Sequence, residues 1–404
     1  MRIIKLYKGD HLNMKDIIFI SLRPFPLRGE EFYFFKELLA AGFTVEGWNV
    51  GKVFLPEISL ETEKTVTSDY WIDITTSDEL LNELKKKVTN NTIFWVWDII
   101  ANMCRCSAFF RFLKANKCLT FDIQYFTRLN LIYQTGGLSR RARFALLDIK
   151  GKINMIKNAI SWRLRYLWKV SFFDFTYDII ISPNPPSNCL RKVFINHFDY
   201  ETYRKDSHLP DLIKVKYAVF LDSSFPLSQQ IKVFGGAKTQ PDEENKILYM
   251  KLMCGFFSMI EQQFGIKVVV AAHPESKNTE ADYGGRTVLR NKACQLTQHA
   301  QFVISQGSTA ISFAVLRHCP LLFCYTNEYK FYLPRMYPLV MAESQLLKAP
   351  FIQVEQYITN PNLSLPKPNI DHEACEKYKY TYLTKPEIEN KENKDIIIDF
   401  FKSL

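Results

Sequence analysis

The chain has 404 residues, of which 47% are hydrophobic, and it carries a formal net charge of +10. This length and composition are ample for a packed core and predict two domains rather than one. The nine cysteines form no CxxC pair and the sequence has no HExxH motif, which argues against a dedicated metal site. Because several cysteines lie within apolar runs, we interpret them as reduced, buried thiols of a cytosolic protein.

The sequence shows neither a secretory signal nor a membrane-spanning helix. Its first residues alternate charged and apolar side chains without a long apolar core. The most apolar stretch, residues 93–113, is interrupted by Asp98 and Arg105. We therefore expect a soluble protein, or one that is peripheral to a membrane.

The first half of the chain has the pattern of a nucleotide-type α/β domain. Strands are predicted at Asp16–Ser21, Thr44–Asn49, Thr92–Val96, residues 119–122 and residues 178–182. Helical patterns separate the earlier strands, and one of them, over residues 32–41, ends at Gly42. There is no GxGxxG fingerprint of a dinucleotide site. A polar, proline-containing stretch near residue 208 marks the end of this domain, which is expected to span residues 1–208.

Residues 139–170 differ from their surroundings, with nine Lys or Arg side chains against a single acid, Asp148. Leucine, isoleucine and tryptophan residues are interleaved with the basic ones. This composition suits a helix on an anionic membrane surface, and equally a solvated helix with one core-facing stripe. Nucleic-acid binding is a weaker interpretation, because no recognised binding module accompanies the segment. We expect no nucleic-acid partner.

The second half predicts another parallel α/β domain, over residues 209–345. Its strands are expected at residues 217–222, residues 268–272, Phe302–Ser305 and Leu321–Tyr325, with a long helix over residues 242–265. Continuous apolar strands alternating with helices indicate a parallel sheet covered on both faces. Residues 346–404 form a C-terminal segment, and the sequence leaves open whether its last helix crosses back onto the first domain.

Chemistry-bearing residues follow three of these strands. The first of the three ends in Asp222, the second runs into His273-Pro274, and the third runs into Gly307-Ser308-Thr309, which opens an apolar helix. In parallel sheets, ligands bind outside the carboxyl ends of the strands. A hydroxyl pair at a helix start is suited to anions, because free backbone N–H groups and the helix dipole point at the ligand. The sequence therefore predicts a nucleotide-phosphate site with one histidine beside it.

At these residues the chain resembles bacterial glycosyltransferases of the GT-B fold that build surface polysaccharides. The likeness is to the sialyltransferase, polysialyltransferase and Kdo-transferase group, which is marked by an acidic motif, a His-Pro motif and a Ser/Thr pair. Here these would be Asp222 in YAVFLDSSFP, His273-Pro274 in AAHPES, and Ser308-Thr309 in SQGSTAISFAVL. The acidic motif departs from the paired acids and glycine of sialyltransferases, since Asp222 is followed by two serines. The resemblance covers roughly residues 194–326.

The resemblance implies two Rossmann-like domains facing a central cleft, and a CMP-linked 2-keto acid sugar as donor. It requires no cofactor and no metal, because CMP leaves readily if protein donors stabilise its phosphate. Ser308, Thr309 and the backbone from Gly307 would cradle the phosphate, although an ordinary helix cap explains the same residues. His273, preceding Pro274, would donate to the departing phosphate, or would simply cap a strand turn.

Asp222 would deprotonate the acceptor hydroxyl, or would attack the anomeric carbon to form a glycosyl-enzyme. The alternative is a turn-forming aspartate. Arg286 would pair with a donor carboxylate or phosphate, since a guanidinium suits such anions, unless it is an exposed loop arginine. In the first domain, Arg23, Arg28 and Glu30 would bind the acceptor sugar, although a solvated loop explains them equally well.

The expected function is thus transfer of a nonulosonic or Kdo-like sugar from its CMP donor to a glycan or lipid-linked glycan acceptor, at the inner face of the membrane. One alternative is a transferase of the same fold that uses a UDP- or GDP-sugar or CDP-glycerol. Another is a non-catalytic nucleotide-binding scaffold of the same pathway, and a two-Rossmann sugar epimerase is a third. The sequence does not distinguish retention from inversion.

Overall fold

The computed structural model describes residues 15–21, 33–54, 70–89, 91–96, 107–125, 177–185, 190–206, 209–227, 241–274, 276–334, 336–360 and 362–404. These residues form two compact units. The first contains the described residues up to Gln124, those from Tyr177 to Ile195, and Lys391–Leu404. The second contains Tyr125 and the described part of residues 196–390.

The first unit is built on a parallel sheet with the strand order β3-β2-β1-β4-β5-β6-β7. Its strands are β1 (Asp16–Ser21), β2 (Thr44–Asn49), β3 (Trp71–Asp73), β4 (Thr92–Val96), β5 (Leu119–Ile123), β6 (Ile179–Ser182) and β7 (Arg191–Phe194). Its helices are α2 (Phe35–Ala40), α3 (Gly51–Phe54), α4 (Ser77–Lys87), α5 (Ser107–Ala115) and α18 (Asn393–Lys402).

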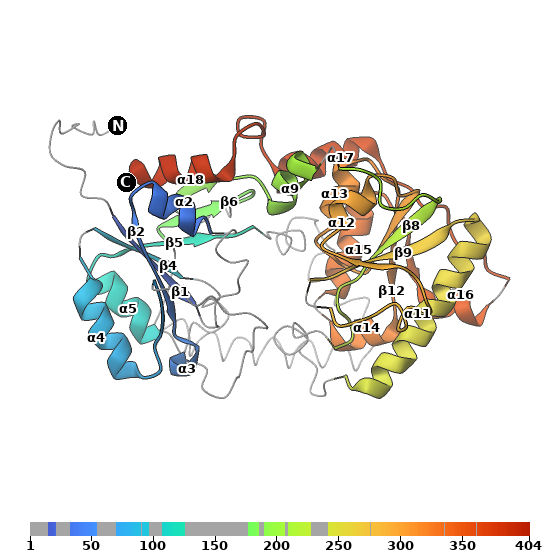
Figure 1. Ribbon diagram of the computed structural model, residues 1–404, viewed down its shortest axis with the longest axis horizontal. Coiled ribbons are helices and arrows are strands. Elements are labelled where there is room, and N and C mark those ends of the chain that lie inside the picture. The colour runs from blue at the N-terminus through green and yellow to red at the C-terminus, as the bar shows by residue number, and fades with distance from the viewer. Residues whose placement is uncertain are drawn as a thin grey trace, which may run out of the picture. The chain divides into compact units, whose positions relative to one another are not determined.

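Alternate residues of the strands in this sheet pack against opposite helical layers, as expected for a strand with period two. Ile18 belongs to a core cluster with Leu84 of α4 and Phe110 of α5. The neighbouring residue Phe19 packs on Phe35 of α2, with 4.3 Å between ring centroids. In Figure 1, α4 and α5 lie together on one side of this sheet, and α2 and α18 lie on the other.

The last helix returns to the first unit. In α18, Phe401 packs against Phe121 of β5 and Phe43, with centroid distances of 5.0 and 6.2 Å. The intervening described residues, up to Asn390, belong to the second unit. The C-terminal segment predicted as one piece from residue 346 is therefore divided between the two units.

The second unit has a parallel sheet with the strand order β10-β9-β8-β11-β12-β13. Its strands are β8 (Tyr217–Leu221), β9 (Lys267–Ala272), β10 (Val288–Arg290), β11 (Phe302–Ser305), β12 (Leu321–Tyr325) and β13 (Phe351–Gln353). Its helices are α9 (Phe198–Asp206), α11 (Glu243–Phe264), α12 (Ala293–Thr297), α13 (Ile311–Leu316), α14 (Asn327–Tyr332), α15 (Tyr337–Leu346), α16 (Val354–Thr359), α17 (His372–Tyr378) and the π-helix η2 (Lys379–Leu383). Figure 1 shows α16 beside the long helix α11.

The long helix α11 is capped at both ends by the residues at which the sequence predicts it to begin and end. Asp242 accepts a hydrogen bond from the Asn245 N–H at 2.9 Å, and the Asn245 side chain accepts one from the Asp242 N–H at 3.1 Å. Gly265 ends the helix in the left-handed conformation, with φ of 64°, which glycine adopts without steric cost. Between these caps, Met253, Phe256 and Ile260 belong to the core of the unit.

The α/β class with two Rossmann-like parallel sheets is confirmed. The domain boundary differs from the one expected at residue 208, because α9 precedes that residue and packs against α12, α13 and η2 of the second unit. The helix predicted over residues 32–41 begins only at Phe35, since Phe34 has a left-handed backbone with φ of 57°. The three-residue strands β3, β10 and β13 were not predicted, because three residues establish no periodicity.

Candidate functional site

The order of the strands in the second unit defines where a ligand can bind. The first strand of this sheet along the chain, β8, lies in its middle. The next two, β9 and β10, lie on one side of β8, and the last three, β11, β12 and β13, lie on the other side. The loops after β8 and β11 therefore diverge at the carboxyl edge, which is where open α/β sheets leave a crevice for ligands. Asp222, His273 and Gln306 come directly after β8, β9 and β11. The structure brings the three predicted motifs to one edge.

Asp222 is almost completely buried at this edge, with 3% of its surface exposed. Its Oδ1 accepts a hydrogen bond from the Ser224 N–H at 2.9 Å, which closes a tight turn after β8. Burial raises the pKa of Asp222, and hydrogen bonding from Ser276, Ser224 and Tyr283 and the charge of His273 oppose the rise without cancelling it. The hydroxyls of Ser276 and Tyr283 lie near the carboxylate. Neither makes a hydrogen bond of normal geometry with Asp222 Oδ2, which is buried without such a partner in the described part of the chain.

A layer of buried polar side chains, which includes Tyr249, Tyr283 and Gln306, lies near Asp222. The Tyr249 hydroxyl donates a hydrogen bond to Oε1 of Gln306, and the other end of that amide contacts Met253 Sδ at 3.8 Å. Burial raises the pKa of Tyr249 and of Tyr283 well above the ordinary tyrosine value, and the nearby Asp222 carboxylate raises both further. Both phenols therefore stay protonated. The Tyr249 hydroxyl is a hydrogen-bond donor to Gln306, and the Tyr283 hydroxyl accepts a hydrogen bond from Nδ2 of Asn278 at 3.4 Å. The sequence offered no signal for this layer, because Tyr249 belongs to an ordinary helical pattern and Tyr283 lies in a polar loop beside Gly284.

His273 is half-buried, and Pro274 after it is exposed. The His273 carbonyl accepts a hydrogen bond from the Ser276 N–H at 2.9 Å. Arg290, at the end of β10, donates to the carbonyl oxygens of Ser276 and Asn278 at 3.2 and 2.6 Å. Arg290 thus fixes the loop that carries His273, a role that sequence reasoning missed because β10 is so short.

The loop after β11 approaches its neighbours closely at Gly307. Its φ is 106°, and a Cβ atom placed there would lie 2.7 Å from Val340 Cγ2 and 2.9 Å from the Tyr329 hydroxyl. Only glycine fits both the conformation and the space. The Ser308 side chain accepts from the Ala310 N–H at 3.3 Å. Thr309 is half-buried, and its hydroxyl and N–H have no hydrogen-bond partner among the described residues.

The predicted helix start differs in detail from the structure. α13 begins at Ile311, its N-cap residue is Ala310, and no side chain caps it. Ser308 and Thr309 therefore precede the helix as a turn instead of opening it. The turn holds Thr309 at the carboxyl edge of the sheet. The helix that follows has only six residues.

Arg286 does not join this edge. It lies before β10, whose Val288 is paired with Val270 of β9, so Arg286 is at the amino end of the sheet. Its guanidinium forms an ion pair with Glu261 of α11, with 2.7 Å between Nη2 and Oε2, and lies 5.5 Å from the Phe257 ring centroid. Burial opposes ionisation of Glu261, but the hydrogen bonds from Arg286 and Val268 prevail and lower its pKa. This satisfied pair leaves the arginine a structural role in place of the predicted donor contact.

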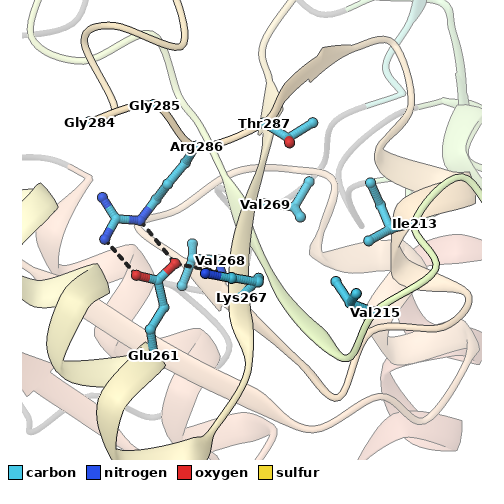
Figure 2. A pocket seen from close by; sticks show the side chains of 10 residues that line it. All are labelled: Ile213, Val215, Glu261, Lys267, Val268, Val269, Gly284, Gly285, Arg286 and Thr287. Atoms are coloured by element: carbon cyan, nitrogen blue, oxygen red, sulfur yellow. Dashed lines mark hydrogen bonds and ion pairs between the residues drawn. The ribbon is translucent and has the colours of Figure 1, made fainter.

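A pocket of about 340 Å³ lies at this opposite end of the sheet. Figure 2 shows Ile213 and Val215 on one of its walls and the Arg286–Glu261 ion pair on the other. It is separate from the His273 edge, because its β9 residues, Lys267, Val268 and Val269, are the first ones of that strand.

Several predicted features lie outside the described residues. These are Arg23, Arg28 and Glu30, which follow β1 in the sequence, and the basic segment 139–170. Six cysteines fall within the described ranges, and all six are free thiols: Cys118, Cys254, Cys294, Cys319, Cys324 and Cys375. No group of three or more His, Cys, Asp or Glu side chains that could hold a metal occurs in these ranges. None of the helices described is long and apolar enough to span a membrane.

No protein-family model and no curated protein matches this sequence. Among solved structures, spinosyn forosaminyltransferase SpnP is 14% identical, over 96% of this chain and 95% of that chain, with a TM-score of 0.37. Arabidopsis thaliana UGT89C1 complexed with UDP is 9% identical, over 96% of this chain and 100% of that chain, with a TM-score of 0.46. A variant of the wall teichoic acid polymerase TagF is 11% identical, over 96% and 89% of the two chains, with a TM-score of 0.45. At these identities and scores the likenesses carry no argument about what this chain does.

Proposed function

We propose that this protein is a glycosyltransferase that moves a nonulosonic or Kdo-like sugar from a CMP-activated donor to a bacterial surface glycan. The observation that carries the proposal is the meeting of Asp222, His273 and the Gly307–Thr309 turn at the point where the strand order of the second sheet reverses. The His273 and Ser308-Thr309 loops flank β8, so their strand ends stand about 10 Å apart at the usual spacing of strands. That gap suits a nucleotide phosphate and the sugar attached to it.

The chemistry assigned to each group follows from its surroundings. In the reaction, the bond between the anomeric carbon and the CMP phosphate oxygen breaks, the acceptor hydroxyl oxygen takes its place, and the proton of that hydroxyl passes to water. His273 donates a hydrogen bond or a proton to the departing phosphate, and the Thr309 hydroxyl and N–H bind the same phosphate. Both are half-buried, so a ligand can reach them.

Asp222 is proposed as the charged support of this site. Its carboxylate lies close enough to His273 for the charges to attract each other, and its turn fixes the loop after β8. To act as the base or nucleophile suggested by the sequence, the carboxylate would have to reach the substrate, and only 3% of Asp222 is exposed. The first domain is proposed to bind the acceptor through Arg23, Arg28 and Glu30, and the basic segment 139–170 to bind anionic lipid.

A nucleotide panel tests the donor. A ligand that binds only the folded state stabilises it by about 2.7 kcal/mol at a hundredfold excess over Kd. Saturating CMP is expected to raise the melting temperature more than UDP or GDP does. Thr309→Val, which keeps the shape and removes the hydroxyl, is expected to weaken the CMP effect. Thr287→Val, at an exposed residue beside the pocket at the opposite end of the sheet, serves as its control. A larger shift with UDP or GDP would replace the CMP donor by another nucleotide sugar.

Hydrolysis separates the enzyme from a non-catalytic nucleotide-binding scaffold. Glycosyltransferases slowly hydrolyse their donors when no acceptor is present, so purified protein is expected to release CMP from CMP-Kdo or a CMP-nonulosonate. Binding of CMP without any release of CMP from these donors, with or without glycan acceptors, would favour the scaffold.

A further inference from the structure

Two histidines face each other on the surface of the second unit. His318 follows α13 and His372 is the first residue of α17, and their Nδ1 atoms are 2.6 Å apart. The ring centroids are separated by 4.5 Å. His372 is exposed, and the His318 side chain is 29% exposed, so solvent and small ions have access to the pair.

A carboxylate sets the orientation of one ring. Glu376 lies one helical turn after His372, and its Oε1 is 3.3 Å from Nε2 of His318. A carboxylate accepts, so Nε2 of His318 carries the proton and its Nδ1 presents a lone pair towards His372. This tautomer is assigned from the partners of the ring. A histidine that donates one ring N–H to a carboxylate, which leaves a lone pair on its other nitrogen, is the arrangement found around metal ligands.

We propose that His318 and His372 bind one divalent transition-metal ion through their two Nδ1 atoms, with Glu376 as the outer carboxylate. In the empty pair, one Nδ1 donates a proton to the other. When a metal enters, His372 moves that proton to its own Nε2 and both Nδ1 lone pairs meet the ion. Metal–nitrogen bonds of about 2.0–2.1 Å at right angles, the geometry of a tetragonal Cu²⁺ site, place the two nitrogens about 2.9 Å apart. The nitrogens, 2.6 Å apart in the empty pair, therefore separate by about 0.3 Å, and the two exposed rings rotate so that both lone pairs point at the ion.

The donor atoms of the pair indicate which metal ions it binds. Imidazole nitrogens suit Cu²⁺, Ni²⁺ and Zn²⁺, and Cu²⁺ binds most tightly in the usual order of divalent ions. Within the described ranges, no third His, Cys, Asp or Glu completes a metal-binding group, so water fills the other positions. The ion would join the end of α13 to the start of α17, independently of any sugar transfer.

The test is a titration of the full-length protein with Cu²⁺, followed by electron paramagnetic resonance of the one-equivalent complex. The expected spectrum shows two nitrogen ligands. His372→Gln and His318→Asn are each expected to lower the Cu²⁺ affinity at least tenfold. Asparagine is chosen because the backbone of His318 has φ of 52°, and asparagine tolerates that conformation. Glu376→Ala is expected to lower the affinity about 10–100-fold, the usual cost of losing an outer-shell partner.

The matched control is His299→Gln, which removes an exposed histidine elsewhere in the same unit and is expected to leave Cu²⁺ affinity unchanged. Melting temperatures of the metal-free variants confirm that they are folded. Wild-type affinity in His372→Gln, a spectrum with thiolate ligands, or an equal loss in His299→Gln would each overturn the assignment.

Discussion

Asp222 Oδ1 accepts a hydrogen bond from the backbone N–H of Ser224, at a distance of 2.9 Å, one residue after the end of β8. The same carboxyl group is 3% exposed, and burial raises its pKa above the ordinary value of 3.8. The turn requires only an oxygen that accepts the Ser224 N–H. The negative charge of the buried carboxylate lowers the stability of the fold and is not required for the turn. Charge and turn can therefore be separated by substitution.

Asp222→Asn keeps an oxygen that accepts from Ser224 and removes the charge. A carboxyl whose pKa is raised on folding contributes stability below its unfolded pKa, and this contribution is lost as pH rises through its folded pKa. Wild type and Asp222→Asn are therefore expected to melt at similar temperatures near pH 4, and the variant is expected to melt higher as pH rises towards 8. A gain of about 1 kcal/mol corresponds to about 2–4 °C in a domain of this size. A melting difference independent of pH would contradict the buried charge.

Gly307→Ala is expected to destabilise the second unit by at least about 2 kcal/mol. The substitution adds the strain of a positive φ, about 1 kcal/mol, to the contacts of a Cβ with Val340 at 2.7 Å and Tyr329 at 2.9 Å. Gly285→Ala is the matched control, because Gly285 has φ of 79° and no atom within 4 Å of its added Cβ. Denaturant titration of both variants isolates the steric part. Equal losses in the two would mean that the neighbours of Gly307 give way.

His273→Ala is expected to lower donor turnover about 10²–10³-fold, the usual loss when one donor to a developing charge is removed. The fold is expected to survive, because His273 is only half-buried and the hydrogen bond to Ser276 comes from its backbone carbonyl. Release of CMP measures turnover, and His299→Ala provides the control. Undiminished turnover in the folded variant would leave His273 with a structural role only.

Arg286→Lys is expected to lower stability without changing the response to nucleotides. A lysine cannot reproduce the guanidinium contacts to Glu261, Ser258 and the Tyr283 carbonyl. Since charged hydrogen bonds contribute about 1.5–3 kcal/mol each, a loss of about 1–2 kcal/mol is expected in this partly exposed setting. Chemical denaturation measures it, and the melting shift caused by nucleotide is compared in both proteins. If Arg286→Lys keeps its stability but loses the melting shift caused by nucleotide, Arg286 would instead be a residue that contacts the donor.

The basic segment 139–170 is expected to bind anionic lipid. Each Lys or Arg near such a surface contributes about 1 kcal/mol, and salt screens it. Co-sedimentation with anionic vesicles is expected to fall when Arg140, Arg141, Arg143, Arg163 and Arg165 are changed to Gln, and to fall for wild type at high salt. Equal binding of wild type to neutral and anionic vesicles would exclude electrostatic attachment.

Long, strongly patterned elements were predicted from sequence alone. β1, β2, β4, β11 and β12 have the predicted bounds. In β1, β4, β11 and β12 a run of mainly apolar residues between turn residues leaves one choice of strand. The Asp242 and Gly265 caps of α11 are likewise local, since each depends on the chemistry of the residues at one helix end. Local signals also placed Asp222 and His273 at the ends of strands and Thr309 in the loop that follows another strand.

Tertiary structure decided which of these residues lie at the carboxyl edge of the second sheet and how deeply each is buried. Sequence could not show that Asp222 is buried near Tyr249 and Tyr283, because burial depends on segments brought together from distant parts of the chain. It could not place Arg286 at the opposite end of the sheet, because that position follows from the pairing of Val288 with Val270 and from an ion pair across 25 residues. The pairing of His318 with His372, 54 residues apart, arises in the same way. Periodicity and caps act over a few residues, whereas the environment of each polar side chain is set by the packing of the whole unit.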